Sequence, residues 1–197
     1  DLLYDVRIEE VMGTTHVAVE SVCTDSRSAK PMSLFVAIKG TQVDGHDYIA
    51  SALANGATTI VCEVAPEGAD NIEGTTFVKV KNSSEALGHI AAAYYDYPSN
   101  EMKLVAVTGT NGKTTTVSLL HSLFRIMDRK AGMVGTVENK INDKSVDSTH
   151  TTPDAISLQK LFRDMVDEGC KFLKNTFELV EIENGSILKN IILQKTK

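Results

Sequence analysis

The segment VAVTGTNGKTTTVSLL, residues 105–120, constrains the fold of this chain more than any other. It follows Leu104, and the apolar run 104–107 predicts a short buried strand. Two glycines, Gly109 and Gly112, come next. Beyond them, apolar residues recur with the spacing of one helix face, at Leu120, Leu123, Phe124 and Met127. A strand, a glycine-rich turn, Lys-Thr and a helix, in that order, predict a phosphate-binding loop in an α/β domain.

The chemistry of this loop follows from its residue types. Glycines allow backbone N–H groups to turn toward an anion, and the start of the helix adds the positive end of its dipole. Lys113 is expected to reach the terminal phosphates of a nucleotide, and the Thr114 hydroxyl to bind a magnesium ion. The common motif has four residues between its glycines, whereas this loop has two, with Val107 where the earlier glycine would stand. A plain strand-to-helix turn is the alternative, and the Gly-Lys-Thr sequence favours phosphate binding over it.

Composition restricts the classes of partner. The chain has 197 residues and a net charge of −6, which gives no broad attraction to nucleic acid or to an anionic membrane. No apolar run approaches the length of a membrane span, and the first residues do not form a signal peptide. The cysteines and histidines show no metal-ligand spacing, and the three cysteines suggest a reducing compartment. We therefore expect a cytoplasmic protein without a protein-built metal cage.

The rest of the chain alternates between strand and helix patterns, which predicts an α/β fold in two parts. Pro98 stops a predicted helix, and the polar stretch after it places the domain boundary between residues 98 and 99. Ser83 or Ser84 is the expected cap of that helix. The expected strands are 33–40, 58–64, 75–80 and 131–139, and the expected helices are 47–57 and 83–98.

A further helix is expected after STHTTPD, residues 148–154. Its apolar face consists of Leu158, Leu161, Phe162 and Met165. Thr152 as N-cap with Pro153 at the first helical position is a sufficient structural reason for this pattern.

Four stretches together resemble the Mur ligases, cytoplasmic enzymes that add amino acids to the peptide of the cell-wall precursor. TDSRSAKPMSLFVAIKGTQVDGHDYI and ANGATTIVCE resemble the nucleotide-sugar domain of the member that adds the third residue. VTGTNGKTTT matches the ATP loop of the family, including its short glycine spacing, and GTVENK with STHTTPD resembles the loop that follows. The resemblance covers residues 1–171 in the order of the family.

The resemblance implies a fold, a reaction and partners. The fold is an N-terminal α/β nucleotide-sugar domain followed by the first part of a P-loop mononucleotide-binding α/β domain. The reaction uses ATP and Mg²⁺ to phosphorylate the carboxylate of UDP-MurNAc-L-Ala-D-Glu. The amine of an amino acid, meso-diaminopimelate or L-lysine, then attacks the acyl phosphate to form an amide.

The resemblance also implies binding roles for individual residues of this sequence. The nucleotide-sugar contacts are expected at Thr24, Ser26, Thr41, Gln42 and Val43. The ATP contacts are expected at Gly109, Thr110, Asn111, Gly112, Lys113, Thr114 and Thr115, with Lys113 and Thr114 acting in catalysis and Thr114 on the metal. The muramyl-dipeptide contacts are expected at His150, Thr151 and Thr152.

Several of these residues have an ordinary structural alternative. TDSR by itself reads as a polar turn, and His150 as a solvated loop residue. Asp44, His46 and Asp47 suggest acid–base chemistry, but turn and cap chemistry is favoured. Arg27 is a candidate for a phosphate contact or for an ion pair that shapes its loop.

The resemblance ends near Phe172. The family continues with a strand carrying MEVSSH, a carbamylated lysine, adenine-binding residues and a C-terminal amino-acid-binding domain, none of which the printed sequence contains. Residues 172–197 are therefore a divergent tail, in which 177–193 suggest a hairpin. A shifted reading frame is one hypothesis for this tail, and translating the coding DNA in the other two frames tests it, because neither would restore MEVSSH if it is wrong.

Two expectations follow for this polypeptide. It is not expected to complete the ligase reaction alone, and a central sheet that stops after its first strands would expose apolar surface and favour self-association. The alternatives are a non-catalytic nucleotide-sugar or ATP-binding fragment, and the related ligase that adds D-Ala-D-Ala. Folylpolyglutamate synthetase shares the loop type but lacks a counterpart of residues 1–98.

Overall fold

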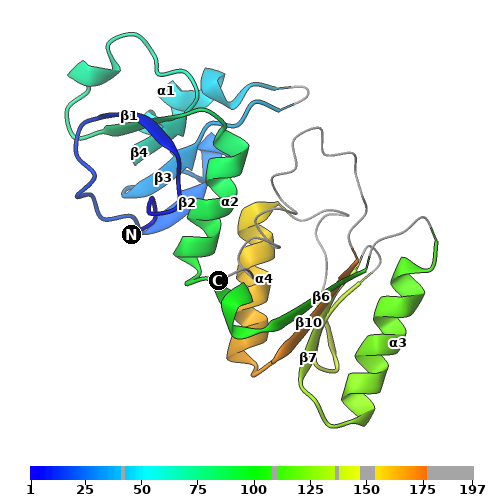
Figure 1. Ribbon diagram of the computed structural model, residues 1–197. Coiled ribbons are helices and arrows are strands. Elements are labelled where there is room, and N and C mark those ends of the chain that lie inside the picture. Colours follow the sequence, from blue (N-terminus) through cyan, green and yellow to red (C-terminus); the bar gives the residue numbers. More distant parts are fainter. Residues whose placement is uncertain (41–42, 108–110, 136–137, 147–153, 177–197) are drawn as a thin grey trace. The chain divides into compact units, whose positions relative to one another are not determined.

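The computed structural model describes residues 1–40, 43–107, 111–135, 138–146 and 154–176, and it divides into two compact units, Asp1–Tyr94 and Tyr95–Lys197. The division falls four residues before the boundary expected from Pro98. Both units contain a mixed sheet, built around parallel strands, together with helices, so the predicted α/β class is confirmed (Figure 1).

Unit 1 is built on a five-stranded sheet with the order β1-β5-β4-β3-β2. β1 is antiparallel to β5, and the other pairs are parallel. The strands are β1 (Ile8–Met12), β2 (Ser21–Cys23), β3 (Ser33–Val36), β4 (Ala57–Cys62) and β5 (Thr76–Val80). The helices are α1 (Ile49–Ala54) and α2 (Ser83–Tyr94), with single 3-10 turns η1 (Ser26–Ser28), η2 (Gly45–Tyr48) and η3 (Ala69–Asn71).

The core of unit 1 lies on both faces of this sheet. On one face Phe35, Ile60 and Phe77 pack with α1, and each is fully buried. Strand residues alternate between faces, and the residues between these, such as Val61 and Val78, are equally buried. Parallel strands with both faces covered read as continuous apolar runs, which is why this part of the sequence was predictable as strand.

Unit 2 contains a second five-stranded sheet with the order β6-β10-β7-β8-β9. β10 lies between β6 and β7 and is parallel to both, while β8 and β9 extend the sheet as an antiparallel hairpin. The strands are β6 (Lys103–Val107), β7 (Ala131–Val134), β8 (Asn139–Ile141), β9 (Lys144–Val146) and β10 (Phe172–Thr176). α3 (Lys113–Ile126) and α4 (Ala155–Asp167) cover opposite faces, and η4 (Pro98–Glu101) precedes β6 (Figure 1).

Helix starts differ from the sequence predictions. α2 is capped by Asn82, whose Oδ1 accepts from the backbone N–H of Glu85 at 3.0 Å, because the Ser83 hydroxyl and N–H are engaged elsewhere. α4 is capped by Asp154, whose carboxylate accepts from Ser157 N at 2.9 Å. The prediction of Thr152 as that cap was therefore wrong, since an aspartate two residues later meets the first turn.

The buried face of α3 also differs from the predicted one. Val117 and His121 are the buried residues of this helix, whereas Leu123 and Met127 are about half exposed. The helix thus contacts the sheet through a face that includes a histidine, and part of its apolar face lies outside the core. The predicted helix exists, and half of its predicted apolar face is confirmed: Leu120 and Phe124 are half-buried, and the Phe124 ring lies 4.7 Å from that of Phe172.

Candidate functional site

The first candidate loop follows β2, at the carboxyl end of its strand. Asp25 caps η1, with Oδ1 accepting from Arg27 N at 2.9 Å, and its Oδ2 forms an ion pair with Arg27 Nη2 at 2.7 Å. Hydrogen bonds from the Arg27 side chain and backbone hold the pKa of the exposed Asp25 carboxyl at about 2. The interpretation of Arg27 as an ion-pair partner that shapes the loop is confirmed.

The same loop is tied to α1. Asn55 Nδ2 donates to the backbone oxygen of Ser26 at 2.9 Å. Ser26 is buried at 5% exposure, and Thr24 is half-buried. The two predicted nucleotide-sugar residues of this loop therefore lie in a turn whose backbone is fixed from two sides.

The second candidate loop follows β3 and closes on itself. Gly40 N donates to Val43 O at 3.0 Å, and Gly45 N donates to Ile38 O at 2.8 Å. A Cβ at Gly45 would stand 2.7 Å from Ile38 N, which explains a glycine at this position. Val43 is 55% exposed, and Thr41 and Gln42 lie outside the described residues. β2 and β3 are parallel, so both candidate loops extend from the carboxyl ends of neighbouring strands, on the same side of the sheet.

A hydrogen-bond chain holds this second loop to the ends of the neighbouring strands. Asp44 caps η2 and its Oδ1 accepts from His46 N at 3.0 Å and contacts His46 Nδ1 at 2.6 Å. Glu63 N donates to His46 Nε2 at 2.9 Å, so Nε2 is an acceptor and Nδ1 carries the proton. Hydrogen bonds from His46, backbone first, lower the pKa of Asp44. The cap interpretation of Asp44 and His46 is confirmed.

Glu63 extends the chain to α2. Its Oε1 accepts from Ser83 N at 3.0 Å and from the Ser83 hydroxyl at 3.1 Å. Asp44, His46, Glu63 and Ser83 therefore link the loops that follow β3, β4 and β5. Sequence reasoning did not identify Glu63, and its only signal is a charged residue directly after a buried strand.

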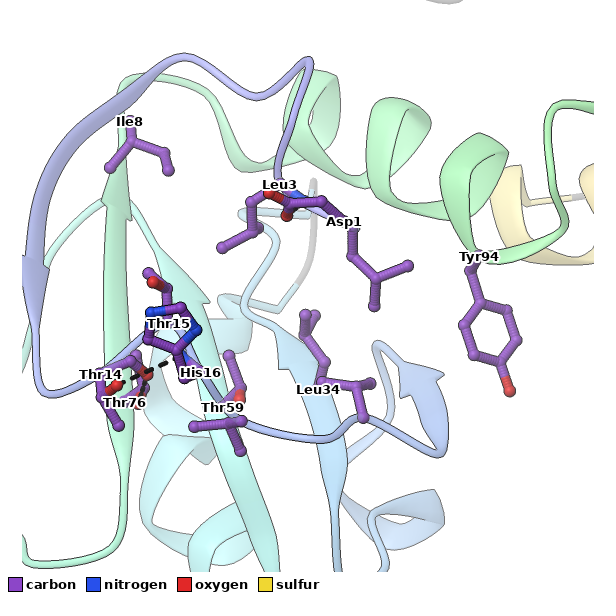
Figure 2. Close-up of a pocket in the computed structure, with 13 residues that line it drawn as sticks. Asp1, Leu3, Ile8, Thr14, Thr15, His16, Leu34, Thr59, Thr76 and Tyr94 are labelled. Carbon is purple, nitrogen blue, oxygen red and sulfur yellow. Dashed lines mark hydrogen bonds between the residues drawn. The ribbon is translucent and has the colours of Figure 1, made fainter.

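A cavity of about 710 Å³ lies elsewhere in unit 1 (Figure 2). Its lining includes Thr14, His16, Leu34, Thr59 and Tyr94, and none of the predicted substrate residues. Thr59 and Leu34 belong to the first halves of their strands, so this cavity lies toward the opposite edge from the two candidate loops. The candidate nucleotide-sugar site is therefore a loop surface at the carboxyl edge, distinct from this cavity.

The predicted phosphate loop stands at the carboxyl end of β6. Gly112 has φ +79° and is the N-cap of α3, a left-handed conformation that favours glycine. Thr116 N donates to Gly112 O at 2.9 Å, which closes the first turn. Lys113 is half-buried, and Thr114 and Thr115 are exposed on that turn. Gly109 and Thr110 lie outside the described residues.

This helix start fits a nucleotide phosphate with magnesium. An ammonium group, two hydroxyls and the N–H groups of a first helical turn are donors suited to phosphate oxygens. Magnesium takes few protein ligands and shares phosphate oxygens and water, so one threonine hydroxyl suffices. The described residues contain no group of three or more His, Cys, Asp or Glu side chains able to hold a metal ion. His150, Thr151 and Thr152 lie outside the described residues.

Two family models match the chain. The Mur ligase catalytic domain matches residues 18–95, and the Mur ligase middle domain matches residues 107–179. The chain belongs to the Mur ligase family. The middle-domain match includes β10, so the first residues of the segment expected to diverge lie within both the match and the sheet.

The chain is similar to curated relatives that are named as ligases of 2,6-diaminopimelate. The chain is 54% identical over 173 residues to the UDP-N-acetylmuramoyl-L-alanyl-D-glutamate–2,6-diaminopimelate ligase of Cytophaga hutchinsonii, covering 86% of this chain and 35% of that protein. It is 41% identical over 192 residues to the enzyme of the same name from Bacteroides thetaiotaomicron, covering 98% of this chain and 38% of that one. The chain thus spans little more than a third of the length of these two relatives.

Solved Mur ligase structures share the fold. A structure of UDP-N-acetylmuramoyl-L-alanyl-D-glutamate–2,6-diaminopimelate ligase superposes with a TM-score of 0.64 at 24% identity, covering 81% of this chain and 32% of that one. A MurF ligase from Thermotoga maritima in complex with ADP has a TM-score of 0.57 at 25% identity, covering 87% and 35%. In the described part of this Mur ligase chain, no helix is long and apolar enough to cross a membrane.

Proposed function

We propose that this chain supplies the nucleotide-sugar site and the phosphate loop of a ligase that joins an amino acid to UDP-MurNAc-L-Ala-D-Glu in the cytoplasm. The observation that carries the proposal is the pair of loops at one edge of the unit 1 sheet, each fixed by hydrogen bonds to a neighbouring element. The names of the relatives favour 2,6-diaminopimelate as the added amino acid. L-lysine and the D-Ala-D-Ala dipeptide are the alternatives that a substrate comparison separates.

The proposed division of labour follows the two parts of the chain. Residues 1–98 hold the UDP-MurNAc moiety, and residues 99–171 form the front of the ATP-binding domain. Residues 172–197 are a tail that diverges beyond its first residues, which form β10 of the unit 2 sheet. Thr24, Ser26, Thr41, Gln42 and Val43 contact the nucleotide sugar. The muramyl-dipeptide contacts are His150, Thr151 and Thr152.

The phosphate loop positions ATP for transfer to a carboxylate. Lys113 neutralises charge on the terminal phosphates, and the N–H groups at the start of α3 orient their oxygens. Thr114 is the protein ligand of a magnesium ion, which when bound neutralises the phosphate charge that develops during transfer. Gly109, Thr110, Asn111, Gly112 and Thr115 complete the loop around the nucleotide.

The proposed reaction proceeds in two steps. The substrate carboxylate attacks the γ-phosphorus, the bond to ADP breaks, and an acyl phosphate forms. The amine of the amino acid then attacks the acyl carbon, phosphate leaves, and the amine loses a proton as the amide forms. Catalysis of the first step depends mostly on positioning and charge neutralisation, which is the work assigned to Lys113 and Thr114.

Calorimetric titration of the chain tests the proposal in two arms. UDP-MurNAc-L-Ala-D-Glu should bind saturably, with UDP-MurNAc as the comparison ligand, and MgADP should bind separately. Lys113→Gln should weaken MgADP binding about tenfold or more and leave the nucleotide sugar unaffected, since a charge-assisted phosphate contact is lost. Lys160→Gln, an exposed lysine on α4, is the matched control and should change neither affinity.

The proposal fails if a folded chain binds neither ligand, or if Lys113→Gln and Lys160→Gln have equal effects. Ligation by the 197-residue polypeptide itself is a separate question. We expect no amino-acid-dependent release of ADP from it, because it spans only 35% and 38% of the length of the two relatives named above. Amino-acid-dependent turnover would contradict that expectation and leave the binding arms intact.

A further inference from the structure

Three lysines stand side by side where the parallel strands of unit 2 begin. Lys103 is the first residue of β6, Lys171 precedes β10, and Lys130 precedes β7. Lys103 N donates to Lys171 O at 2.8 Å, and Lys171 N donates to Lys130 O at 3.2 Å. Adjacent strands lie about 4.8 Å apart, so the backbones of neighbouring lysines in this row are separated by about one strand spacing.

A hollow of about 600 Å³ opens at this row. Besides the three lysines it is lined by Arg129, Phe172 and two acidic residues, Glu101 and Asp128. Glu101 already forms an ion pair with Arg163 at 2.8 Å. Lys130 Nζ donates to the backbone oxygen of Glu168 at 3.1 Å, which orients its ammonium group without neutralising it. The hollow therefore carries four cations against two carboxylates.

Within the part of the chain that the structure describes, these four cations form no ion pair. In residues 1–40, 43–107, 111–135, 138–146 and 154–176, no carboxylate forms an ion pair with Lys103, Arg129, Lys130 or Lys171. The concentration of positive charge contrasts with the net charge of −6 of the whole chain. Adjacent like charges repel, and an anion bound among them would relieve that repulsion.

We propose that this hollow is a binding site for a small phosphate-bearing anion. One carboxylate offers a single charge and two oxygens, which cannot meet three ammonium groups and a guanidinium together. A pyrophosphate or nucleotide phosphate brings several oxygens and at least two charges, and Arg129 can bind two oxygens at once.

The site is separate from the phosphate loop. Lys103 begins β6 and Val107 ends it, so the hollow and the loop lie at opposite ends of the strand. Five extended residues span about 13 Å, which is too far for one pyrophosphate to reach both. The site therefore does not depend on the function proposed above.

Inorganic pyrophosphate is the probe, titrated calorimetrically at low ionic strength into the Lys113→Gln chain, which lacks the lysine of the phosphate loop. Saturable binding to one site is expected, and it should weaken as salt is added. Adding Lys103→Gln and Lys171→Gln should weaken it about tenfold or more, because two charge-assisted contacts are lost. The amide signals of residues 103, 130 and 171 should shift on titration in a heteronuclear NMR spectrum.

The control carries Lys81→Gln and Lys160→Gln in the same background, two exposed lysines outside the hollow. It removes the same net charge and should bind pyrophosphate as the parent does. Circular dichroism establishes that both double variants fold. The proposal is overturned if the Lys113→Gln chain does not bind pyrophosphate, or if the two double variants lose affinity equally.

Discussion

The two sheets differ in how completely their parallel strands are covered. In unit 1, β3 is buried along its whole length and β4 nearly so, on both faces. In unit 2, β6 is an edge strand with Val105 38% exposed, although it leads into the phosphate loop. α3, which follows that loop, exposes an apolar stripe with one helical spacing, made of Leu119, Leu123, Ile126 and Met127.

The two candidate loops of unit 1 are held by side chains from neighbouring strands and helices, through Asn55, His46 and Glu63. Among the strands that the structure describes, β6 pairs only with β10, just as β2, which leads into the first candidate loop, pairs only with β3. Both sheets therefore have an edge strand before a candidate loop, and they differ in how completely their central parallel strands are buried.

The largest expected effect is a matched pair of valine truncations, one in each sheet. Val61→Ala in β4 removes fully buried methyl groups and should lower the free energy of unfolding of unit 1 by about 2 kcal/mol or more. Val105→Ala in β6 should cost less than about 1 kcal/mol, since that side chain is partly exposed already. Urea unfolding followed by circular dichroism measures both. Equal losses would mean that the edge of unit 2 is as well packed as the centre of unit 1.

The second effect concerns Lys174, in the middle of the unit 2 sheet. It is fully buried, its Nζ has no hydrogen-bond partner among the described residues, and it lies 3.6 Å from the centroid of the Phe124 ring. Burial lowers its pKa from 10.5 to about 8. Lys174→Met should therefore stabilise unit 2 by about 1–3 kcal/mol at pH 7, because an unsatisfied polar group is removed.

The pH dependence gives the sign of this effect. Between pH 8 and 10.5 the unfolded chain binds the Lys174 proton and the folded chain does not, so the parent gains stability as the pH rises. The advantage of Lys174→Met should shrink over the same window, as measured by thermal unfolding at several pH values. Lys160→Met, at an exposed position on α4, is the control. A destabilised or pH-independent Lys174→Met variant would mean that the ammonium group is satisfied where it lies.

The third effect tests the loop network of unit 1. His46→Ala leaves the part-buried backbone N–H of Glu63 without its acceptor. It should lower the free energy of unfolding by about 1–2 kcal/mol. It should also weaken UDP-MurNAc-L-Ala-D-Glu binding about tenfold, because the loop loses its preorganisation. His89→Ala, at a half-buried histidine on α2, is the control for both readouts. Unchanged affinity in His46→Ala would mean that the hydrogen-bond network does not contribute to nucleotide-sugar binding.

The smallest effect on stability, and a clear one on association, is expected on the α3 stripe. We propose that the chain self-associates through this stripe and the open edge of β6. Leu123→Glu and Ile126→Glu should reduce association in sedimentation velocity while changing the free energy of unfolding by less than about 0.5 kcal/mol, as surface changes do. Val64→Glu, at a 69% exposed valine of unit 1, should leave association unchanged. A monomeric parent would contradict the proposal.

Sequence reasoning was most successful where one short-range pattern decides the structure. The turn at Gly112 was predictable because a left-handed residue at a helix start favours glycine. The strands of unit 1 were predictable because parallel strands that are buried on both faces form apolar runs. Sequence reasoning failed where distant residues compete. Thr152 was chosen as a cap because it precedes a proline, but Asp154 binds the first turn, and Glu63 gained its role only through contacts to His46 and Ser83.

The buried lysine of β10 shows the same limit in another form. No local pattern indicates that Lys174 lies beneath Phe124, since the strand that carries it inserts between β6 and β7 from far along the chain. The exposure of Leu123 and Met127 on α3 was mispredicted for the same reason. The burial of this helix is decided by the strands that it meets, not by its own apolar spacing.

Hydrogen exchange of the whole chain, with and without UDP-MurNAc-L-Ala-D-Glu, tests the contrast between the two units most directly. The amides of β3 and β4 should exchange most slowly and those of β6 fastest among the parallel strands. The ligand should slow exchange in residues 24–28 and 38–46 and leave β6 unchanged. Protection of β6 equal to that of β4, or slowing confined to the lining of the unit 1 cavity, would contradict the account.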